Sequence, residues 1–248
     1  MKANGNTVLI TGGSTGIGFA LASSLSGLGN KVIICGRSEE KLRKAKESIP
    51  EVETRKCDLS NLSDVQSLVE WTTSHFPDLN LLVNNAGIQR YIDLKKGAQE
   101  LLSGGDEIAI NFRSQVILSE YFIPIFAKID RPAAIVNISS GLAFVPLARF
   151  PIYCATKAAI HSFTMSLRRQ LKNTNIRVFE VIPSTVYDTF LKGKPIEKTD
   201  YSVSSREVAD ATIKGLEEEE YEITVGPTNN WIKASKSELD SIFNNMNN

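Results

Sequence analysis

Short apolar runs rich in β-branched residues alternate with longer segments of helical spacing along nearly the whole chain. The runs have the length of strands, and they lie at 7–10, 31–35, 52–56, 79–83, 133–138, 177–182 and 222–225. Between and after them, apolar residues recur every three or four positions and predict helices at 17–28, from 39 to before 50, and at 62–75, 98–102, 107–128, 152–172, 206–220 and 236–246. Strands that alternate with helices form parallel sheets that are covered on both faces. The pattern therefore predicts an α/β fold with a doubly wound parallel sheet of about seven strands and helices on both faces.

Length and charge narrow the class of protein further. The 248 residues include 28 Lys and Arg and 28 Asp and Glu, so the formal net charge is zero. A chain of this length fits one domain, 1–248. A neutral chain lacks the positive field that attracts nucleic acid or anionic lipid, and no run approaches the ~20 apolar residues of a membrane span. The first residues lack the apolar core of a signal peptide. We expect a cytoplasmic protein that binds neither nucleic acid nor membrane.

A glycine-rich turn joins the first predicted strand to the first predicted helix. It reads Thr11-Gly12-Gly13-Ser14-Thr15-Gly16-Ile17-Gly18. Glycines in such a turn let the backbone approach a pyrophosphate, whose charge is stabilised by free amide groups and the helix dipole. The turn therefore indicates a dinucleotide site, and its spacing differs from the G-x-G-x-x-G of most two-domain dehydrogenases.

A tyrosine and a lysine four residues apart are the second candidate for chemistry. Tyr153 and Lys157 would share one helix face, and a nearby cation favours phenolate, which brings the pKa of a tyrosine closer to neutrality. The same spacing recurs at Tyr91 and Lys95, but in a polar stretch without a partner serine. Tyr153 instead opens a long predicted helix after a strand that ends in Ser139-Ser140. Position therefore favours Tyr153.

In their order and spacing these motifs resemble the short-chain dehydrogenase/reductase superfamily, over essentially the whole chain. The residues that carry the resemblance are the glycine turn at 11–18, Cys57-Asp58-Leu59-Ser60, the tetrad Asn84–Gly87, Asn111, Ser139-Ser140, Tyr153 and Lys157. Segments such as VIICGRSEEKL, NNAGIQR and YCATKAA are most similar to a bacterial branch, the DltE type, encoded beside the teichoic-acid D-alanylation genes. The resemblance implies a single-domain Rossmann fold that transfers hydride between a nicotinamide cofactor and a carbonyl or alcohol carbon.

The resemblance also implies four catalytic residues. Tyr153 would be the general acid in reduction and the base in oxidation, and Lys157 would lower the pKa of Tyr153 and hold the nicotinamide ribose. Ser140 would hydrogen-bond the reacting oxygen, with Ser139 the less favoured choice. Asn111 would hold a water in a proton relay to the lysine, and the alternative is a plain buried amide.

The remaining implied contacts are to the cofactor. Asp58 would accept a hydrogen bond from the adenine amino group, and 85–87 would line the adenosine ribose. The full set of expected cofactor contacts is Gly12, Ser14, Thr15, Gly16, Ile17, Gly18, Arg37, Ser38, Asp58, Leu59, Asn85, Ala86, Gly87, Tyr153, Lys157, Pro183, Val186 and Thr189.

The end of the second predicted strand indicates NADP(H) rather than NAD(H). An acidic residue there would bind the ribose hydroxyls of NAD and repel a 2′-phosphate, but this chain has Gly36. Arg37 and Ser38 follow and offer donors suited to phosphate. Glu39 and Glu40 are explained by the first turn of the next helix, for which Ser38 is the expected N-cap. The alternative is that Arg37 points into solvent.

After the sixth predicted strand the chain departs from the family pattern Pro-Gly-x-Val-x-Thr. It reads Pro183-Ser184-Thr185-Val186-Tyr187-Asp188-Thr189, so serine replaces glycine and the threonine comes one position late. Either Tyr187 is an insertion or Asp188 has taken the place of the threonine. The following polar segment, about 187–205, would be a short substrate loop over an open, permissive active site.

Other candidate residues favour plainer interpretations. No Cys/His cluster has zinc spacing, so we expect no metal. His161 is more simply packed at a helix face than catalytic, and Cys154 more simply a buried thiol. Arg90 would meet either an anionic substrate or, more simply, solvent.

Together these features predict an NADP(H)-dependent carbonyl reductase that acts on a small carbonyl compound. One alternative is an alcohol or sugar-alcohol dehydrogenase that runs the same residues in reverse. The other is a non-catalytic dinucleotide sensor, against which the intact set of Asn111, Ser140, Tyr153 and Lys157 argues. Association through 107–128 and 152–172 would resemble the dimers and tetramers of the family and predicts a homodimer or homotetramer.

Overall fold

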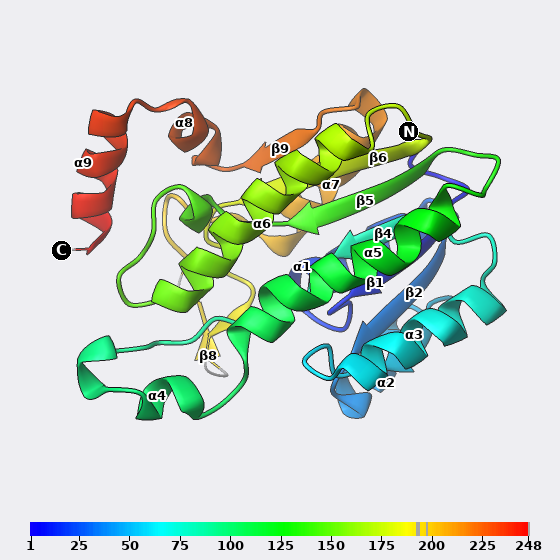
Figure 1. The fold of residues 1–248 in the computed structure, drawn as a ribbon, viewed down its shortest axis with the longest axis horizontal. Helices are drawn as coiled ribbons and strands as arrows, with labels where there is room; N and C mark the ends of the chain where they lie inside the picture. The colour runs from blue at the N-terminus through cyan, green and yellow to red at the C-terminus, as the bar shows by residue number, and fades with distance from the viewer. Residues whose placement is uncertain (192–193, 197, 248) are drawn as a thin grey trace.

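The computed structural model, which describes residues 1–191, 194–196 and 198–247, is built on a parallel sheet of seven strands (Figure 1). The strands are β1 (Thr7–Thr11), β2 (Lys31–Gly36), β3 (Glu53–Lys56), β4 (Leu81–Asn84), β5 (Ala133–Ile138), β6 (Ile176–Pro183) and β9 (Glu222–Val225). Their order across the sheet is β3-β2-β1-β4-β5-β6-β9. The chain thus winds outward from β1 in one direction, returns to β4 beside it and winds outward in the other. This confirms the predicted doubly wound fold.

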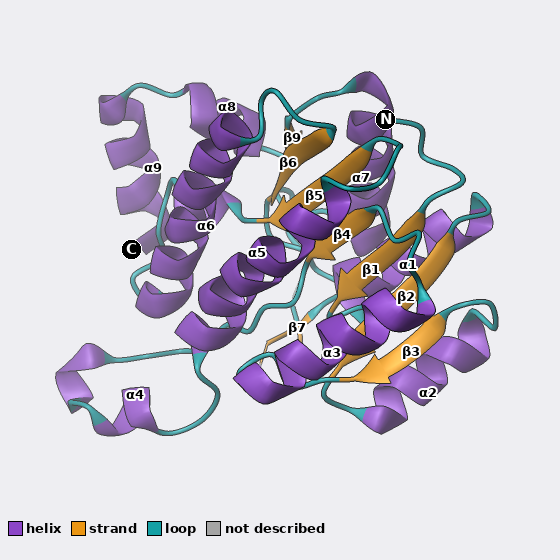
Figure 2. Cartoon of the chain, turned by 45° about the vertical axis from the view of Figure 1, so that its right-hand side comes forward, coloured by secondary structure: helices purple, strands orange, loops and turns teal. Residues whose placement is uncertain are grey.

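Helices cover both faces of the sheet (Figure 2). One hydrophobic core lies under α1 (Gly16–Gly27), α2 (Glu39–Ser48) and α7 (Ser205–Glu218), and a second lies under α3 (Leu62–His75), α5 (Ser114–Phe126) and α6 (Pro151–Gln170). Within β1, Val8 and Ile10 belong to the first core and Leu9 to the second, because successive side chains of a strand point to opposite faces. Two covered faces explain why central strands such as β1 and β5 are buried along their whole length and are mostly apolar, unlike β3 at the edge of the sheet.

Most helix boundaries lie within two residues of the predicted ones. Ser38 caps α2 as predicted, since its hydroxyl accepts a hydrogen bond from the Lys41 amide at 3.3 Å. The helix predicted at 107–128 differs, because it begins as a π-helical turn at Ala109–Arg113 before α5. In a π-helical turn the backbone hydrogen bonds join residues five positions apart, instead of four as in an α-helix.

Several short elements were not predicted. Strands β7 (Phe190–Leu191) and β8 (Lys194–Pro195) pair antiparallel within the predicted substrate loop, and α8 (Thr228–Lys233) precedes α9 (Lys236–Asn247). Helix α4 (Gln99–Leu102) stands out from the body of the fold in the loop before α5 (Figure 1). Among the described residues, no helix combines the length and apolar character needed to cross a membrane.

Candidate active site

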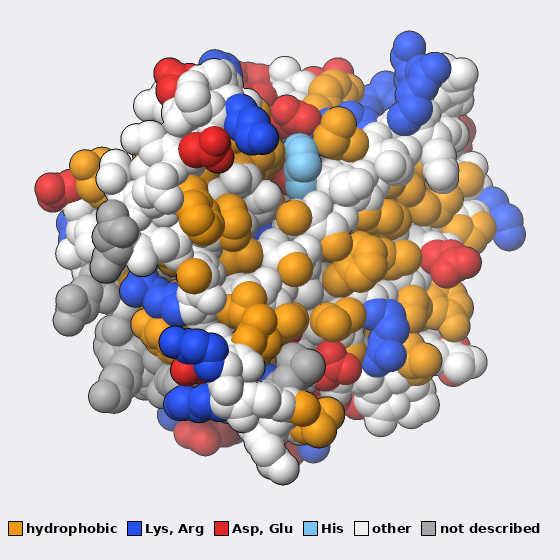
Figure 3. Space-filling view, turned by 60° about the vertical axis from the view of Figure 1, so that its left-hand side comes forward, with side chains coloured by type: hydrophobic (Ala, Val, Ile, Leu, Met, Phe, Trp, Pro, Cys, Tyr) orange, Lys and Arg blue, Asp and Glu red, His pale blue; other side chains and the backbone are white. Residues whose placement is uncertain are grey.

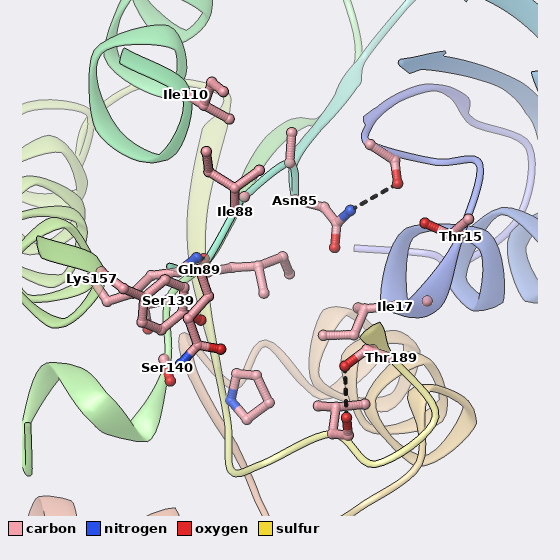
Figure 4. Close-up of a pocket in the computed structure, with 18 of the residues that line it drawn as sticks. Thr15, Ile17, Asn85, Ile88, Gln89, Ile110, Ser139, Ser140, Lys157 and Thr189 are labelled. Atoms are coloured by element: carbon pink, nitrogen blue, oxygen red, sulfur yellow. Dashed lines mark hydrogen bonds between the residues drawn. The ribbon is translucent and has the colours of Figure 1, made fainter. Parts of the chain in front are cut away.

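A cavity of about 710 Å³ opens at the carboxyl ends of the strands, around the junction of β1 and β4. This is the switch point where ligands bind in doubly wound folds. The glycine turn and α1 form one side of it, and Ser139, Ser140 and Lys157 lie on the other (Figure 4). The predicted site residues that line it are Gly12, Ser14, Thr15, Gly16, Ile17, Arg37, Ser38, Asp58, Leu59, Asn85, Ala86, Gly87, Ser140, Tyr153, Lys157, Pro183, Val186 and Thr189. The fold therefore unites motifs that lie up to 177 residues apart in the chain (Gly12 to Thr189).

Gly18, predicted to contact the cofactor, lies behind the cavity wall instead. A Cβ atom on Gly18 would stand 2.4 Å from the carbonyl oxygen of Gly12 and 2.5 Å from Nδ2 of Asn85. That Nδ2 donates to the carbonyl oxygen of Thr11 at 2.8 Å. It also donates to the carbonyl oxygen of Gly12 at 3.3 Å, the dashed line from Asn85 in Figure 4. Gly18 therefore lets α1 pack closely against the glycine turn, and Asn85 fastens the turn to the end of β4.

The start of α1 has the features of an anion site. Its N-cap residue, Thr15, makes no side-chain capping hydrogen bond, and its first turn holds no acidic residue. The first amide groups of a helix lack partners within the helix, and its dipole favours negative charge there. A diphosphate fits these residues, because the backbone offers donors and no side chain competes for them.

On the side of the cavity formed by the glycine turn, the end farthest from Tyr153 is lined by the residues that follow β2. Gly36 leaves room there, since a Cβ atom on it would meet only the Ser14 hydroxyl, at 3.5 Å, and a methyl of Leu42. Arg37 is exposed and lines the cavity. Burial alone would raise the pKa of Asp58. Hydrogen bonds from Ser60 and the charge of Arg37 together have the larger, opposite effect, so the pKa of Asp58 lies below its usual value. Asp58 is therefore an ionised acceptor at neutral pH.

Tyr153, Lys157 and Ser140 meet at the opposite end of the cavity. Lys157 Nζ donates to the Ile138 carbonyl oxygen at 2.7 Å and lies 5.5 Å from the centroid of the Tyr153 ring. Burial raises the pKa of Tyr153 to about 12, although the hydrogen bond with Ser140 lowers it. Burial also lowers the pKa of Lys157 to about 8, against the charge of Glu180. The predicted shift of the Tyr153 pKa toward neutrality is absent, because desolvation outweighs the neighbouring groups.

Asn111 is close to this group but wholly buried, outside the cavity lining. Its Nδ2 donates to the Ile88 carbonyl oxygen and its Oδ1 accepts from the Ile88 amide, both at 2.8 Å. A Cβ atom on Gly87 would lie 3.5 Å from Oδ1 of Asn111 and 3.7 Å from Nζ of Lys157. These bonds hold the segment after β4 beside Lys157, and the role of Asn111 in a proton relay stays a prediction.

The departures after β6 have structural partners. The Ser184 hydroxyl donates to the Tyr201 carbonyl oxygen at 3.0 Å, which ties the predicted substrate loop to the sheet. The Asp188 carboxylate accepts hydrogen bonds from both the amide and the hydroxyl of Ser205, each at 2.8 Å, and so binds the first residue of α7. Asp188 is therefore turned away from the cavity.

Thr189, one position later, faces the glycine turn. Its hydroxyl donates to the Val186 carbonyl oxygen at 2.7 Å (Figure 4), and its methyl lies 3.1 Å from where a Cβ on Gly16 would stand. The threonine thus reaches the start of α1 despite its shifted position. Residues 192–193 and 197 of the predicted loop, 187–205, lie outside the described residues.

Sequence reasoning missed the walls beside Tyr153 and Ser140. These walls come from loops and short helices and include Ile88, Gln89, Leu142, Leu147, Arg149, Phe150, Ile196 and Trp231. Gly141 was the one hint of these walls in the sequence, because a glycine after Ser139-Ser140 leaves room for a large neighbour. A Cβ atom on Gly141 would lie 2.6 Å from the Trp231 ring. Asn247 of α9 braces the loop that holds Leu147, because its Nδ2 donates to the Pro146 carbonyl oxygen at 3.1 Å.

The other candidate residues serve the fold. Both interpretations of Arg90 are wrong, because its guanidinium donates to the carbonyl oxygens of Ser103 and Gly105. His161 packs at the helix face as predicted, with Nδ1 2.9 Å from a carboxylate oxygen of Glu180. Burial raises the pKa of the Cys154 thiol, in line with an inert cysteine. In the part of the chain that the structure describes, no cluster of three His, Cys, Asp or Glu side chains is placed to hold a metal ion.

Comparison with known proteins gives consistent similarities. The model of the short chain dehydrogenase family matches residues 6–199. The uncharacterized oxidoreductase DltE of Bacillus subtilis is 48% identical over 250 residues, which cover 100% of this chain and 98% of that protein. A short chain dehydrogenase from Burkholderia cenocepacia, solved in complex with NADP, superposes with a TM-score of 0.80 at 26% identity, covering 98% of this chain and 99% of that one. A Burkholderia phymatum enzyme in complex with NAD has the same fold, with a TM-score of 0.80 at 22% identity over 90% of each chain.

Proposed function

This chain belongs to the short-chain dehydrogenase family and is an oxidoreductase, and from that premise we propose that it is an NADP(H)-dependent carbonyl reductase. The observation that carries the proposal is one cavity with a free helix start and Arg37 on one side and Ser140, Tyr153 and Lys157 on the other. The first set suits a phosphorylated dinucleotide, and the second suits proton transfer to a carbonyl oxygen. We further propose that the protein acts in the cytoplasm and that 187–205 forms its substrate loop.

The residues present fit a nicotinamide dinucleotide. The backbone at Gly12–Ile17 would hold the diphosphate, Asp58 the adenine and Lys157 the nicotinamide ribose. When bound, the cofactor supplies or accepts the hydride. Thr189 would bind beside the diphosphate, since it faces Gly16 across the cavity.

Protonation favours reduction as the working direction. With a pKa of about 12, Tyr153 carries its proton at neutral pH and can donate it to a carbonyl oxygen as the carbonyl carbon accepts hydride. The carbonyl carbon thus gains a hydride, which brings two electrons and one proton, and the carbonyl oxygen gains the proton that Tyr153 gives up, so the product is an alcohol. Ser140 would hydrogen-bond the oxygen where negative charge develops, and the Lys157 ammonium would stabilise the tyrosinate that forms. Oxidation would have to begin from that tyrosinate, which burial disfavours.

A spectrophotometric assay tests this function. NADPH oxidation should be measured with aldehydes, ketones and diketones, and NADP⁺ reduction with alcohols and sugar alcohols. We expect several carbonyl compounds to be reduced. Faster turnover of the alcohols at neutral pH would instead establish a dehydrogenase. Tight NADPH binding without turnover of any compound would establish a dinucleotide sensor.

Arg37 should select NADPH over NADH. Charge-assisted hydrogen bonds to a 2′-phosphate correspond to about 10–150-fold in discrimination. The exposed guanidinium of Arg37 lines the cavity beside Gly36, which stands where an acidic side chain at the end of β2 would repel that phosphate. We expect Arg37→Ala to abolish the preference when kcat/KM is measured with each cofactor.

Arg43→Ala is the matched control, because Arg43 lies on α2 in an exposed ion pair with Glu47 and outside the cavity. It should retain the NADPH preference. Equal or better use of NADH by the wild-type protein would contradict the assignment.

We propose a homodimer or homotetramer that associates through α5 and α6. Helix α5 holds one charged residue, Glu120, and exposes Tyr121 at 41%, while α6 exposes Met165 at 50%. Figure 3 shows hydrophobic side chains gathered across much of one face of the molecule with few charged ones between them. A helix that is apolar nearly all round favours burial against a partner.

Sedimentation velocity at micromolar concentration should therefore find an even-numbered particle. Met165→Asp should shift it toward monomer, because a buried carboxylate would oppose association. Leu62→Asp, at an exposed position on α3, should leave the particle unchanged. A wild-type monomer would refute the proposal.

A further inference from the structure

Arg149 is a cavity residue that neither the fold nor the proposed chemistry uses. It lines the cavity on the side of Tyr153, just before α6 begins. Its side chain makes no hydrogen bond or ion pair with any residue that the structure describes. The other cations of the cavity are placed differently, since Arg37 and Lys41 lie at the adenine end and Lys157 is buried.

The guanidinium of Arg149 is nevertheless held in place. Its central carbon lies 5.3 Å from the centroid of the Phe150 ring and 5.9 Å from that of Tyr91. The two rings pack against each other with centroids 4.6 Å apart, and Phe150 is buried. The backbone is fixed as well, because the Arg149 carbonyl oxygen accepts a hydrogen bond from the Ile92 amide at 3.2 Å. Stacking on aromatic faces holds an arginine while leaving its N–H donors free at the edge of the plane.

The walls that the structure describes at this end of the cavity carry no carboxylate, although the buried carboxyl of Glu107, outside the lining, is close enough to add to the rise that burial causes in the pKa of Tyr153. Among the described lining residues the only carboxylate is Asp58, which belongs to the adenine end. The walls between Tyr153 and Arg149 are apolar and include Leu142, Leu147 and Trp231. A substrate that fits has a carbonyl group for Tyr153, an apolar body for these walls and a negative charge for the guanidinium.

We propose that Arg149 is an anion-binding residue of the substrate site, and that the substrates are oxo acids whose carboxylate it binds. This inference rests on the proposed reductase function for the carbonyl, whereas the carboxylate site stands on the geometry of Arg149 alone. Planar carboxylates match the fork of an arginine in two parallel hydrogen bonds. The site thus specifies a chemical class of substrate.

The test begins with binding, which requires no turnover. Calorimetry on the NADPH-saturated enzyme should compare hexanoate with hexanamide, which has the same chain and no charge. We expect hexanoate to bind at least 10-fold more tightly, as charge-assisted hydrogen bonds imply. Arg149→Gln should abolish that preference, and Arg43→Gln, on the distant surface of α2, should retain it. Equal binding of the two compounds, or a preference that survives Arg149→Gln, would overturn the proposal.

Turnover then separates the two proposals. Six-carbon oxo acids, with the ketone at different distances from the carboxylate, should be compared with their methyl esters. At least one acid should exceed its ester in kcat/KM by about 10-fold or more, and Arg149→Gln should remove the difference. If hexanoate binds through Arg149 but no carbonyl compound is reduced, the reductase function fails and the anion site stands. If carbonyl compounds are reduced and every ester matches its acid, the reductase function stands and the anion site fails.

Discussion

Replacing Tyr153 with phenylalanine should lower the turnover of carbonyl compounds by about 10²–10⁴-fold, the usual contribution of a general acid. The substitution removes the proton that the pKa of about 12 keeps on the phenol, while the ring still packs beside Lys157. Cofactor binding should persist, because the diphosphate and adenine contacts lie on the other side of the cavity. Steady-state kinetics and NADPH titration of the same preparation would measure both effects.

Tyr221→Phe is the matched control for this experiment. Tyr221 stacks on Phe179, with ring centroids 5.2 Å apart, and lies outside the cavity lining. Loss of its hydroxyl should leave turnover within about twofold, as for surface changes remote from a site. Near wild-type reduction by Tyr153→Phe would remove Tyr153 from the mechanism.

Removing the imidazole of His161 should destabilise the fold by about 3 kcal/mol, because it leaves the carboxylate of Glu180 buried without its partner. Glu180 is 0% exposed, and its two oxygens lie 2.9 and 3.2 Å from Nδ1 of His161. We place the expectation at the lower end of the range for buried pairs, since the His161 side chain is 24% exposed. Urea denaturation of His161→Gln and wild type would measure the difference.

The effect should depend on pH in a defined direction. The hydrogen bond to Glu180 raises the pKa of His161 above its usual value of 6.5. A raised histidine pKa stabilises the folded state fully below the unfolded pKa, and this contribution is lost as pH rises through the folded pKa. The difference in free energy of unfolding between wild type and His161→Gln should therefore be larger at about pH 6, below the usual histidine pKa, than at about pH 9. An equal loss at both values would contradict a charged pair.

A double variant supplies the control for the pair. His161→Gln combined with Glu180→Gln places two neutral amides at the site, so no carboxylate stays buried there, although the nearby Lys157 loses the charge of Glu180. It should be more stable than His161→Gln alone, and the difference measures the coupling between the two residues. Two independent, additive losses would show that the side chains act separately.

The sequence predicted the elements whose signal is periodic and local. An apolar run such as Leu81-Leu82-Val83, within the strand predicted at 79–83, indicates a strand covered on both faces, and the central strands could be assigned in this way. The signals of the glycine turn and of Tyr153 with Lys157 were also local, because each depends on the spacing of residues within one turn or on one helix face. Parallel topology then brought them to one edge of the sheet without further information.

The substrate side of the cavity has no such signal. Arg149 and Trp231 come from a loop and a six-residue helix, 82 positions apart, and meet only through tertiary packing. The π-helical turn at Ala109–Arg113 had no signal either, since its neighbourhood reads as a regular helix. Gly18 carried the family pattern, but only the coordinates distinguish a glycine that contacts a ligand from one that lets two backbones touch.

Ser184 lies against Gly226 and limits the residues that fit there. The serine stands where the family pattern has glycine, and its Oγ lies 2.5 Å from the place that a Cβ on Gly226 would occupy. Gly226 also has a φ of 77°, so any other residue there would be strained twice. A side chain at 226 would have to displace the Ser184 hydroxyl, which donates to the carbonyl oxygen of Tyr201. The space at this turn and the anchoring of residues 187–205 therefore depend on the same serine.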